Sequence, residues 1–416
     1  MNCLTLFSNV GIDEIYLKDH GINVVVANEI EKDRAEFYRK LHPDVKMIQG
    51  DINDKKVFNK VLKYAKEKNC ELVIATPPCQ GMSIANATRA KNNDPRNSLI
   101  KLVIRIVLKL KPKFILIENV PGMEKTFVKH DDHEGINEVI EYLEADNTDD
   151  GDNNNVDDII KRLDSEQNTI SASKHNIINI MDYIRHRLPA SYEIRSKVLN
   201  ASDYGTPQNR KRLIVLISKD GCWDHPNPTT PNDKKITVRQ AIGDLPSIEA
   251  GDRSDLPWHY GKKAAPRHIK WMKNTPTGKS AYDNPFDPER GWDQFHPVTE
   301  DEDTHKIREI KGFKSTYKRI DWDKPAPTIG MTNGAINSQN NVHPGRPNED
   351  GTYSDARVLS VRELLILCGI EANFLDDFQY VNENFLRKVI GECFPPQFCA
   401  SMMTSLTKIN RDNNEL

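Results

Sequence analysis

Short continuous runs of apolar residues alternate with amphipathic stretches through the first 120 residues. Continuous runs of this kind predict buried strands, and apolar residues at helical spacing predict helices. The expected strands are Asn2–Phe7, Asn23–Ala27, Val45–Ile48, Leu72–Ala75 and Phe114–Ile117, and the expected helices are Ile12–His20, Glu31–Leu41 and Asp54–Lys68. Because apolar strands alternate with helices, we predict a doubly wound α/β fold whose parallel sheet is covered on both faces.

This alternation stops at residues 124–172, which form an acidic insert. The centre of the insert, Asp146–Asp158, has few apolar residues and many like charges, so we expect it to be disordered. The alternation then resumes with an expected helix at Ile177–Arg187 and expected strands at Glu193–Leu199 and Leu213–Ile217. We therefore assign residues 1–220 to one large domain that contains the insert.

Residues 221–318 are rich in proline, charge and aromatic side chains and show little periodicity, which indicates a second, smaller domain. Helical spacing returns at Ser360–Leu367 and Phe385–Thr407. We expect residues 319–416 to return to the large domain.

The formal net charge of −3 hides an uneven distribution, because residues 131–166 carry −12 and the rest of the chain carries +9. A basic body is compatible with a polyanionic partner. The seven cysteines include no C-x-x-C pair, which argues against a zinc ribbon or a disulfide framework, and we expect no metal site. No stretch approaches the roughly 20 apolar residues that span a bilayer.

Candidate chemistry gathers where the expected strands end, the edge at which doubly wound sheets bind ligands. The first strand leads into Phe7–Gly11, which could be a nucleotide-binding loop or a plain turn. Glu29 follows the second strand and could bind ribose hydroxyls, or be a solvated carboxylate at a helix N-terminus. Asp51 follows the third strand and could bind an adenine amino group, or cap a helix.

The sharpest candidate is Cys79, which follows the fourth strand in the segment Thr76-Pro77-Pro78-Cys79-Gln80-Gly81. A cysteine at this edge stands where an exposed nucleophile would be placed, although many cysteines are inert and buried. Glu118 follows the neighbouring fifth strand and could act as an acid toward a bound base, or serve as a helix cap.

A third candidate segment is Gln208-Asn209-Arg210-Lys211-Arg212, just before another expected strand. In an extended chain, side chains two residues apart share a face, so Arg210 and Arg212 would present two guanidinium groups together. Such a pair suits an anion or a ring oxygen, and the alternative is a solvated strand edge.

Taken in order, these segments resemble the DNA (cytosine-5) methyltransferases. The resemblance continues through Arg319-x-x-Trp322-Asp323-x-Pro325-x-Pro327-Thr328, Arg357-x-Leu359-Ser360-x-Arg362-Glu363 and Gly391-x-x-x-Pro395-Pro396, and spans residues from about 3 to 405. It implies a mostly parallel seven-stranded sheet that binds S-adenosylmethionine, with residues 221–318 as a target-recognition domain. The family pattern has glycine where Asn9 stands and asparagine where Glu392 stands.

The resemblance also implies roles for individual residues. The Cys79 thiolate would attack C6 of cytosine, Glu118 would hold the N3/N4 edge, and Arg210, supported by Arg212, would lie near O2. S-adenosylmethionine would donate the methyl group and leave as S-adenosylhomocysteine. Its expected contacts are Phe7, Gly11, Glu29, Asp51, Ile52, Pro78 and Glu392.

The expected substrate is double-stranded DNA, from which the target base must be flipped. Residues 256–280 contain six Lys/Arg and no Asp/Glu, interleaved with aromatic residues, which favours DNA contact over a merely solvated face. The expected DNA contacts are Gln80, Ser83, Arg89, Arg96, Gln208, Arg267, Lys270, Lys273 and Lys279.

The resemblance further implies a monomeric restriction-modification enzyme in a prokaryotic cytoplasm, associated with the nucleoid when on DNA and with no membrane partner. A cognate restriction endonuclease would act separately. One alternative is a tRNA cytosine-5 methyltransferase of the same fold. Another is a DNA-binding protein with a degenerate cofactor site, which Asn9 and Glu392 suggest and which the intact Cys79, Glu118, Arg210 and Arg212 argue against.

Overall fold

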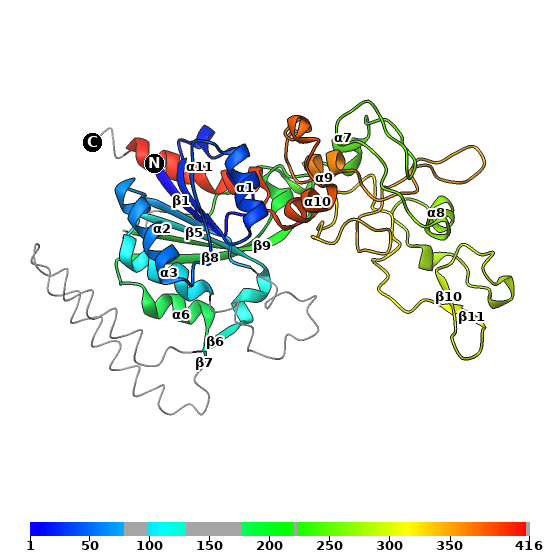
Figure 1. Ribbon diagram of the computed structural model, residues 1–416, viewed down its shortest axis with the longest axis horizontal. Coiled ribbons are helices and arrows are strands. Elements are labelled where there is room, and N and C mark those ends of the chain that lie inside the picture. Colours follow the sequence, from blue (N-terminus) through cyan, green and yellow to red (C-terminus); the bar gives the residue numbers. More distant parts are fainter. Residues whose placement is uncertain (79–98, 130–176, 220–222, 413–416) are drawn as a thin grey trace, which may run out of the picture.

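A computed structural model describes residues 1–78, 99–129, 177–219 and 223–412 (Figure 1). It contains a seven-stranded sheet in the order β3-β2-β1-β4-β5-β9-β8. The strands are β1 (Asn2–Leu6), β2 (Asn23–Glu29), β3 (Lys46–Gln49), β4 (Leu72–Ala75), β5 (Phe114–Asn119), β8 (Tyr192–Asn200) and β9 (Lys211–Lys219). All neighbours pair in parallel except β9, which is antiparallel to β5 and β8. The predicted mostly parallel sheet is confirmed.

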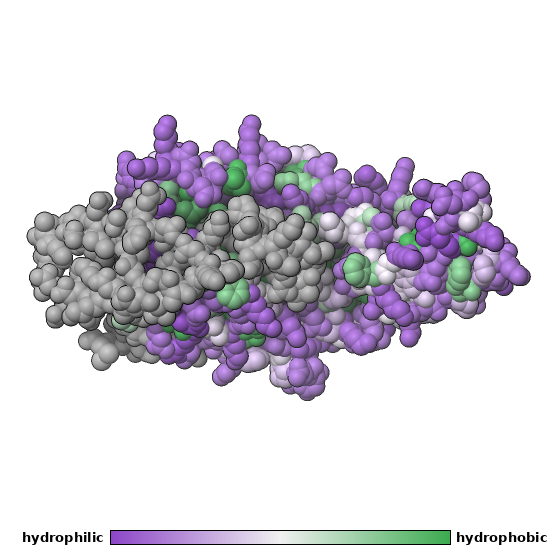
Figure 2. All heavy atoms as spheres, turned by 90° about the horizontal axis from the view of Figure 1, so that it is seen from below, coloured by the Kyte–Doolittle hydropathy of each residue, from purple (hydrophilic) through white to green (hydrophobic). Residues whose placement is uncertain are grey.

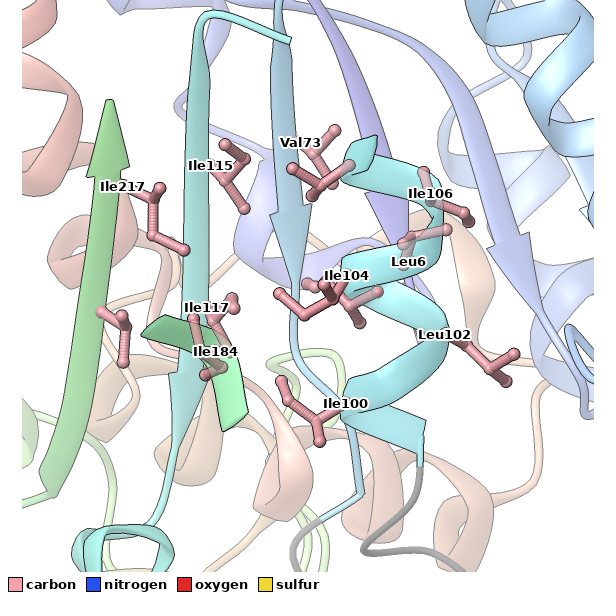
Figure 3. Close-up of a cluster of buried hydrophobic side chains, with 14 of the residues drawn as sticks. Leu6, Val73, Ile100, Leu102, Ile104, Ile106, Ile115, Ile117, Ile184 and Ile217 are labelled. Atoms are coloured by element: carbon pink, nitrogen blue, oxygen red, sulfur yellow. The ribbon is translucent and has the colours of Figure 1, made fainter. Parts of the chain in front are cut away.

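Helices cover both faces of this sheet. On one face lie α2 (Lys55–Glu67), α3 (Leu99–Leu110) and α6 (Ile180–Arg187). Figure 3 shows Ile100 and Ile104 of α3 against Ile115 and Ile117 of β5, and all four side chains are buried. The opposite face is covered by α1 (Lys32–Leu41) and α11 (Pro396–Asp412), the latter lying beside β1 in Figure 1.

Three segments differ from the sequence prediction. Residues 12–20 form two short 3-10 turns, Ile12–Glu14 and Lys18–His20, instead of one helix. The N–H groups of this segment bond three residues back, as Ile15 does to Ile12 and Leu17 to Glu14, which gives tight turns in place of α-helical bonding.

The predicted helix at 177–187 begins only at Ile180, because β7 (Ile177–Asn179) pairs with β6 (Phe127–Lys129). The Asn179 side chain then caps α6 by accepting from the Met181 N–H. The closing helix is broken between α10 (Glu383–Glu392) and α11, where Pro395 and Pro396 lack the N–H groups that a continuous helix needs.

A smaller unit lies at the right of Figure 1 and includes α8 (Pro266–Lys273) and the hairpin β10 (Val298–Glu300)–β11 (Ile307–Glu309). Figure 2 shows mainly hydrophilic residues on the face seen there, with isolated apolar side chains between them. The hydrophobic core of this small unit contains Trp271, Met272, Ala281, Val298, Tyr317, Ile336, Val342, Ala356 and Val358. Packing in this unit therefore extends to residue 358, beyond the expected boundary at 318.

A separate apolar cluster joins the small unit to the large one. It combines α7 (Val238–Ile242), α9 (Val361–Leu367) and α10 with Val10, Ile12 and Phe37 from the large unit. The two units therefore share buried contacts. Within the described ranges, no helix combines the length and apolar character that crossing a membrane requires.

A buried ion network anchors α9 in this cluster. Arg357 donates to both carboxylate oxygens of Glu363 at 2.8 and 2.9 Å and to Asp355 at 2.8 Å, and the three residues are at most 1% exposed. Burial would raise the pKa of Glu363, but Arg357 lowers it to about 2. The same carboxylate accepts from the Ser360 N–H at 2.7 Å and thereby closes a capping box at the start of α9.

Replacing Arg357 with methionine should reduce the free energy of unfolding by about 3 to 5 kcal/mol, because two buried carboxylates lose their partner. Chemical denaturation measures the change. The matched control is Arg239→Ala, which removes the exposed ion pair with Asp323 and should leave stability unchanged. Equal effects of the two substitutions would contradict the role of the buried network.

Candidate active site

The sheet topology brings the candidate residues to one edge. Strands β1, β2, β4 and β5 are parallel and end at the same edge, which carries Phe7, Glu29, Pro78 and Glu118. Strand β9 runs in the opposite direction and therefore begins at this edge. Arg212 lies at its start, so residues far apart in the chain meet here.

Glu118 and Arg212 form a mostly buried ion pair at this edge. Arg212 Nε lies 2.7 Å from Glu118 Oε1, and the side chains are 12% and 11% exposed. Asn119 donates from Nδ2 to the Pro77 carbonyl at 3.0 Å and so ties the end of β5 to the segment that precedes Cys79. Cys79, Gln80, Ser83, Arg89 and Arg96 lie outside the described residues.

Arg210 and Gln208 do not take the predicted places. Arg210 is 2% exposed and donates from Nη1 to the Ile329 carbonyl at 2.8 Å and from Nη2 to the Gly391 carbonyl at 3.0 Å. Arg212, and not Arg210, therefore faces Glu118. Gln208 is fully buried, with its amide bonded to the Leu367 carbonyl and the Ile329 N–H, so its prediction as a DNA contact is wrong.

The loop after β1 is shaped by residues with positive φ: Phe7 (61°), Asn9 (49°) and Gly11 (76°). A Cβ atom on Gly11 would lie 2.4 Å from His42 Nε2, so only glycine fits there. Asn9 donates from Nδ2 to the Val389 carbonyl at 3.2 Å. Its Oδ1 atom is buried and has no hydrogen-bond partner among the described residues.

Glu29 holds this loop in place. Its carboxylate accepts from the Asn9 N–H at 2.9 Å and from the Glu31 N–H at 2.8 Å, and the residue is 4% exposed. Burial raises the pKa of Glu29, while these N–H groups and the charge of Arg34 act in the opposite direction. Ile30, which sequence reasoning missed, follows directly and is 54% exposed although it is apolar.

The other expected cofactor contacts are spread around the same edge. Asp51 is exposed, and its Oδ1 accepts from the Asn53 N–H at 2.9 Å. Ile52 is only 3% exposed and packs in the core on the α2–α3 face of the sheet. Glu392 pairs with Arg34 at 2.7 Å, a contact that sequence reasoning also missed because 358 positions separate the two residues.

Three of the expected DNA contacts in the small unit, Arg267, Lys273 and Lys279, are exposed. Lys270 instead forms an ion pair with Asp293. Sequence reasoning overlooked Phe313, which is 71% exposed and stands between Lys311 and Lys314, both also exposed. An aromatic residue between two lysines was the available signal, and it lay outside the basic stretch at 256–280.

Two adjacent carboxylates are buried behind this edge. Asp13 and Glu14 are 7% and 5% exposed, and the Tyr38 hydroxyl donates to Glu14 Oε2. Burial raises the pKa of Asp13 to about 7, with a further contribution from the charge of Glu118. Burial and the charge of Asp13 raise the pKa of Glu14 to about 8.

Comparison with known proteins agrees with the fold. The family model for C-5 cytosine-specific DNA methylases matches residues 1–147 and 165–408. The chain therefore belongs to the C-5 cytosine-specific DNA methylases, enzymes that methylate cytosine in DNA.

Curated relatives support this membership. The type II methyltransferase M1.HgaI of Avibacterium volantium is 42% identical over 399 residues, which cover 94% of each chain. The type II methyltransferase M1.HphI of Haemophilus parahaemolyticus is 25% identical and covers 98% of this chain and 87% of its own. Among solved structures, the Entamoeba histolytica methyltransferase EhMeth shares the fold, with a TM-score of 0.55, 14% identity and coverage of 99% and 98%.

The buried acid pair makes stability depend on pH. The pKa values of Asp13 (about 7) and Glu14 (about 8) in the folded state exceed those of unfolded carboxyls, so the folded chain binds more protons. Stability should therefore fall as pH rises from about 5 to 8. Glu14→Gln should weaken this dependence, while Asp19→Asn on an exposed side chain should not. Urea denaturation at several pH values checks this, and an unchanged slope in Glu14→Gln would disprove it.

Proposed function

We propose that this methyltransferase transfers a methyl group from S-adenosylmethionine to C5 of a flipped cytosine in double-stranded DNA, through a covalent adduct of Cys79 with C6. The observation that carries the proposal is the Glu118–Arg212 ion pair of 2.7 Å, which lies next to the Pro77-Pro78 segment that precedes Cys79. A carboxylate oriented by a guanidinium suits the polar edge of a cytosine.

In the proposed reaction the Cys79 thiolate adds to C6, and the electrons of the C5–C6 double bond make C5 nucleophilic. Glu118 binds the N3/N4 edge and favours protonation at N3. Arg212 orients Glu118 and stands near O2, the place first expected for Arg210. After C5 has accepted the methyl group, it loses its proton and the sulfur–C6 bond breaks, which releases the product and the thiolate.

The residues around the β1 loop fit the proposed cofactor. Asn9 Oδ1 is a buried acceptor with no partner in the part of the chain that the structure describes, and Glu29 and Asp51 place carboxylates at the ends of β2 and β3. Exposed Ile30 offers an apolar surface to a purine ring. When bound, S-adenosylmethionine supplies an activated methyl group on sulfur. Phe7, Gly11, Ile52, Pro78 and Glu392 complete the proposed set of residues at this site.

We assign DNA contact to the exposed basic residues Arg267, Lys273 and Lys279 and to Phe313 between its two lysines. The same proposal includes Gln80, Ser83, Arg89 and Arg96, which follow Cys79 in the sequence. The relatives M1.HgaI and M1.HphI are type II methyltransferases, which supports a role in a restriction-modification system beside a separate endonuclease. We further propose that the enzyme acts as a monomer in the cytoplasm.

The first test is methyl transfer from labelled S-adenosylmethionine to plasmid DNA, with tRNA in parallel and bisulfite sequencing of the product. Site-specific 5-methylcytosine in DNA is expected, together with its complete loss in Cys79→Ser, because serine lacks a thiolate. Transfer to tRNA alone would overturn the DNA substrate, and full activity of folded Cys79→Ser would overturn the covalent mechanism.

The two arginines provide a matched pair of substitutions. Arg212→Lys should reduce kcat by roughly 100-fold with little change in thermal stability, because it disturbs the group that orients Glu118. Arg210→Lys should instead lower the melting temperature, because Arg210 holds the Ile329 and Gly391 carbonyls together. Thermal unfolding and single-turnover kinetics separate the two effects, and the reverse assignment would refute this division of roles.

A further inference from the structure

Two side-chain contacts hold the C-terminal end of α10 against the proposed cofactor site. Asn9 of the β1 loop donates to the Val389 carbonyl of α10 at 3.2 Å. Arg34 of α1 pairs with Glu392 at the end of α10 at 2.7 Å, and these side chains are only 15% and 19% exposed. Both contacts join segments that lie at opposite ends of the sequence.

Both contacts involve residues that depart from the family pattern. Asn9 stands in place of a glycine, and Glu392 stands in place of an asparagine. Asn9 has a φ of 49°, a left-handed conformation that asparagine tolerates better than most residues. The substitution therefore keeps a backbone shape that glycine would also allow, and it adds the contact with Val389.

The second departure brings an additional negative charge to the site. Glu29 already places a buried carboxylate here; burial raises its pKa, and the charge of Arg34 acts in the opposite direction. Glu392 without a partner would add like charge in a poorly solvated place, which is unfavourable. Arg34 lies 2.7 Å from Glu392 and also acts on Glu29, so one guanidinium compensates both carboxylates.

The fit between Gly391 and Gly330 explains why α10 must be held accurately. A Cβ atom on Gly391 would lie 2.2 Å from the Gly330 carbonyl oxygen, so the two main chains touch. The Gly391 carbonyl in turn accepts from Arg210 at 3.0 Å. Gly391, next to Glu392, therefore contacts Arg210, which directly precedes β9, the strand that carries Arg212.

We propose that Arg34 and Glu392 are positioning residues that, together with Asn9, fix α10 against the β1 loop and so set the affinity for S-adenosylmethionine. The two departures from the family pattern are then parts of one compensating set, and neither marks a degenerate site. This inference rests on the proposed function, because it concerns the cofactor assigned there.

The test compares Glu392→Asn, Arg34→Ala and the double variant, with the dissociation constants of S-adenosylmethionine and S-adenosylhomocysteine measured by calorimetry on the full chain without DNA. Glu392→Asn restores the family residue but removes the ion pair that joins α1 to the end of α10, so it should weaken binding roughly tenfold, or about 1.4 kcal/mol. The double variant should bind better than Arg34→Ala, because it removes the carboxylate that Arg34→Ala leaves without a partner, and the two effects should therefore not add. In methyl-transfer assays, KM for the cofactor should rise while kcat stays near the wild-type value.

The opposite view, in which Glu392 is merely a defect, predicts that Glu392→Asn binds the cofactor more tightly. That result, or unchanged binding in all three variants, would overturn the proposal. The control is Glu71→Asn, which breaks the Lys113–Glu71 pair (2.6 Å) just before β4 and β5 and should leave cofactor affinity unchanged.

Two further measurements keep the outcome clear. Thermal unfolding without cofactor identifies a variant that has lost its fold. The single variants Arg34→Lys and Glu392→Gln then provide milder changes. Of these, Arg34→Lys is expected to bind the cofactor better than Arg34→Ala. A wild-type chain that binds no cofactor would overturn the proposed function and this inference together, whereas equal binding by wild type and variants would overturn this inference alone.

Discussion

The antiparallel entry of β9 beside β5 is the constraint on which the rest of the candidate active site depends. A parallel strand at this position would begin at the far edge of the sheet and carry Arg212 away from Glu118. Because β9 runs in the opposite direction, it starts where β5 ends, and the two side chains meet at 2.7 Å with little exposure to water. Arg210, just before β9, uses the same entry to hold two distant segments together, since it binds the carbonyls of Ile329 and Gly391.

The sequence allowed the sheet to be predicted because its strands are continuous apolar runs, which burial on both faces requires. It failed where tertiary contacts overrode local pattern. Residues 12–20 have helical composition, but Ile12 and Leu17 are buried in two different apolar clusters, and the segment forms two tight turns. The small unit showed no periodicity because its core is assembled from single residues between 271 and 358, where the chain has few regular elements to impose a repeat.

For the site, the positions of Glu29, Glu118 and Arg212 followed from their places at strand ends. What could not be predicted is which arginine reaches the carboxylate. Alternation along an extended chain places Arg210 and Arg212 on the same side. It does not reveal that Arg210 binds the main-chain carbonyl of Ile329 while Arg212 pairs with Glu118. The Arg34–Glu392 pair was equally hidden, because a contact across 358 positions leaves no trace in local spacing. Both cases concern charged side chains whose partners come from distant segments.

The position of α11 in the chain has a consequence for synthesis on the ribosome. This helix packs Phe398, Met402 and Met403 on the face of the sheet that includes Leu72, Ile74 and Leu116, and it follows every strand in chain order. A growing chain can therefore pair its strands long before the residues that shield this face have left the exit tunnel. During that interval the nascent sheet exposes an apolar surface, which makes the unfinished protein a natural client for chaperones that bind hydrophobic segments.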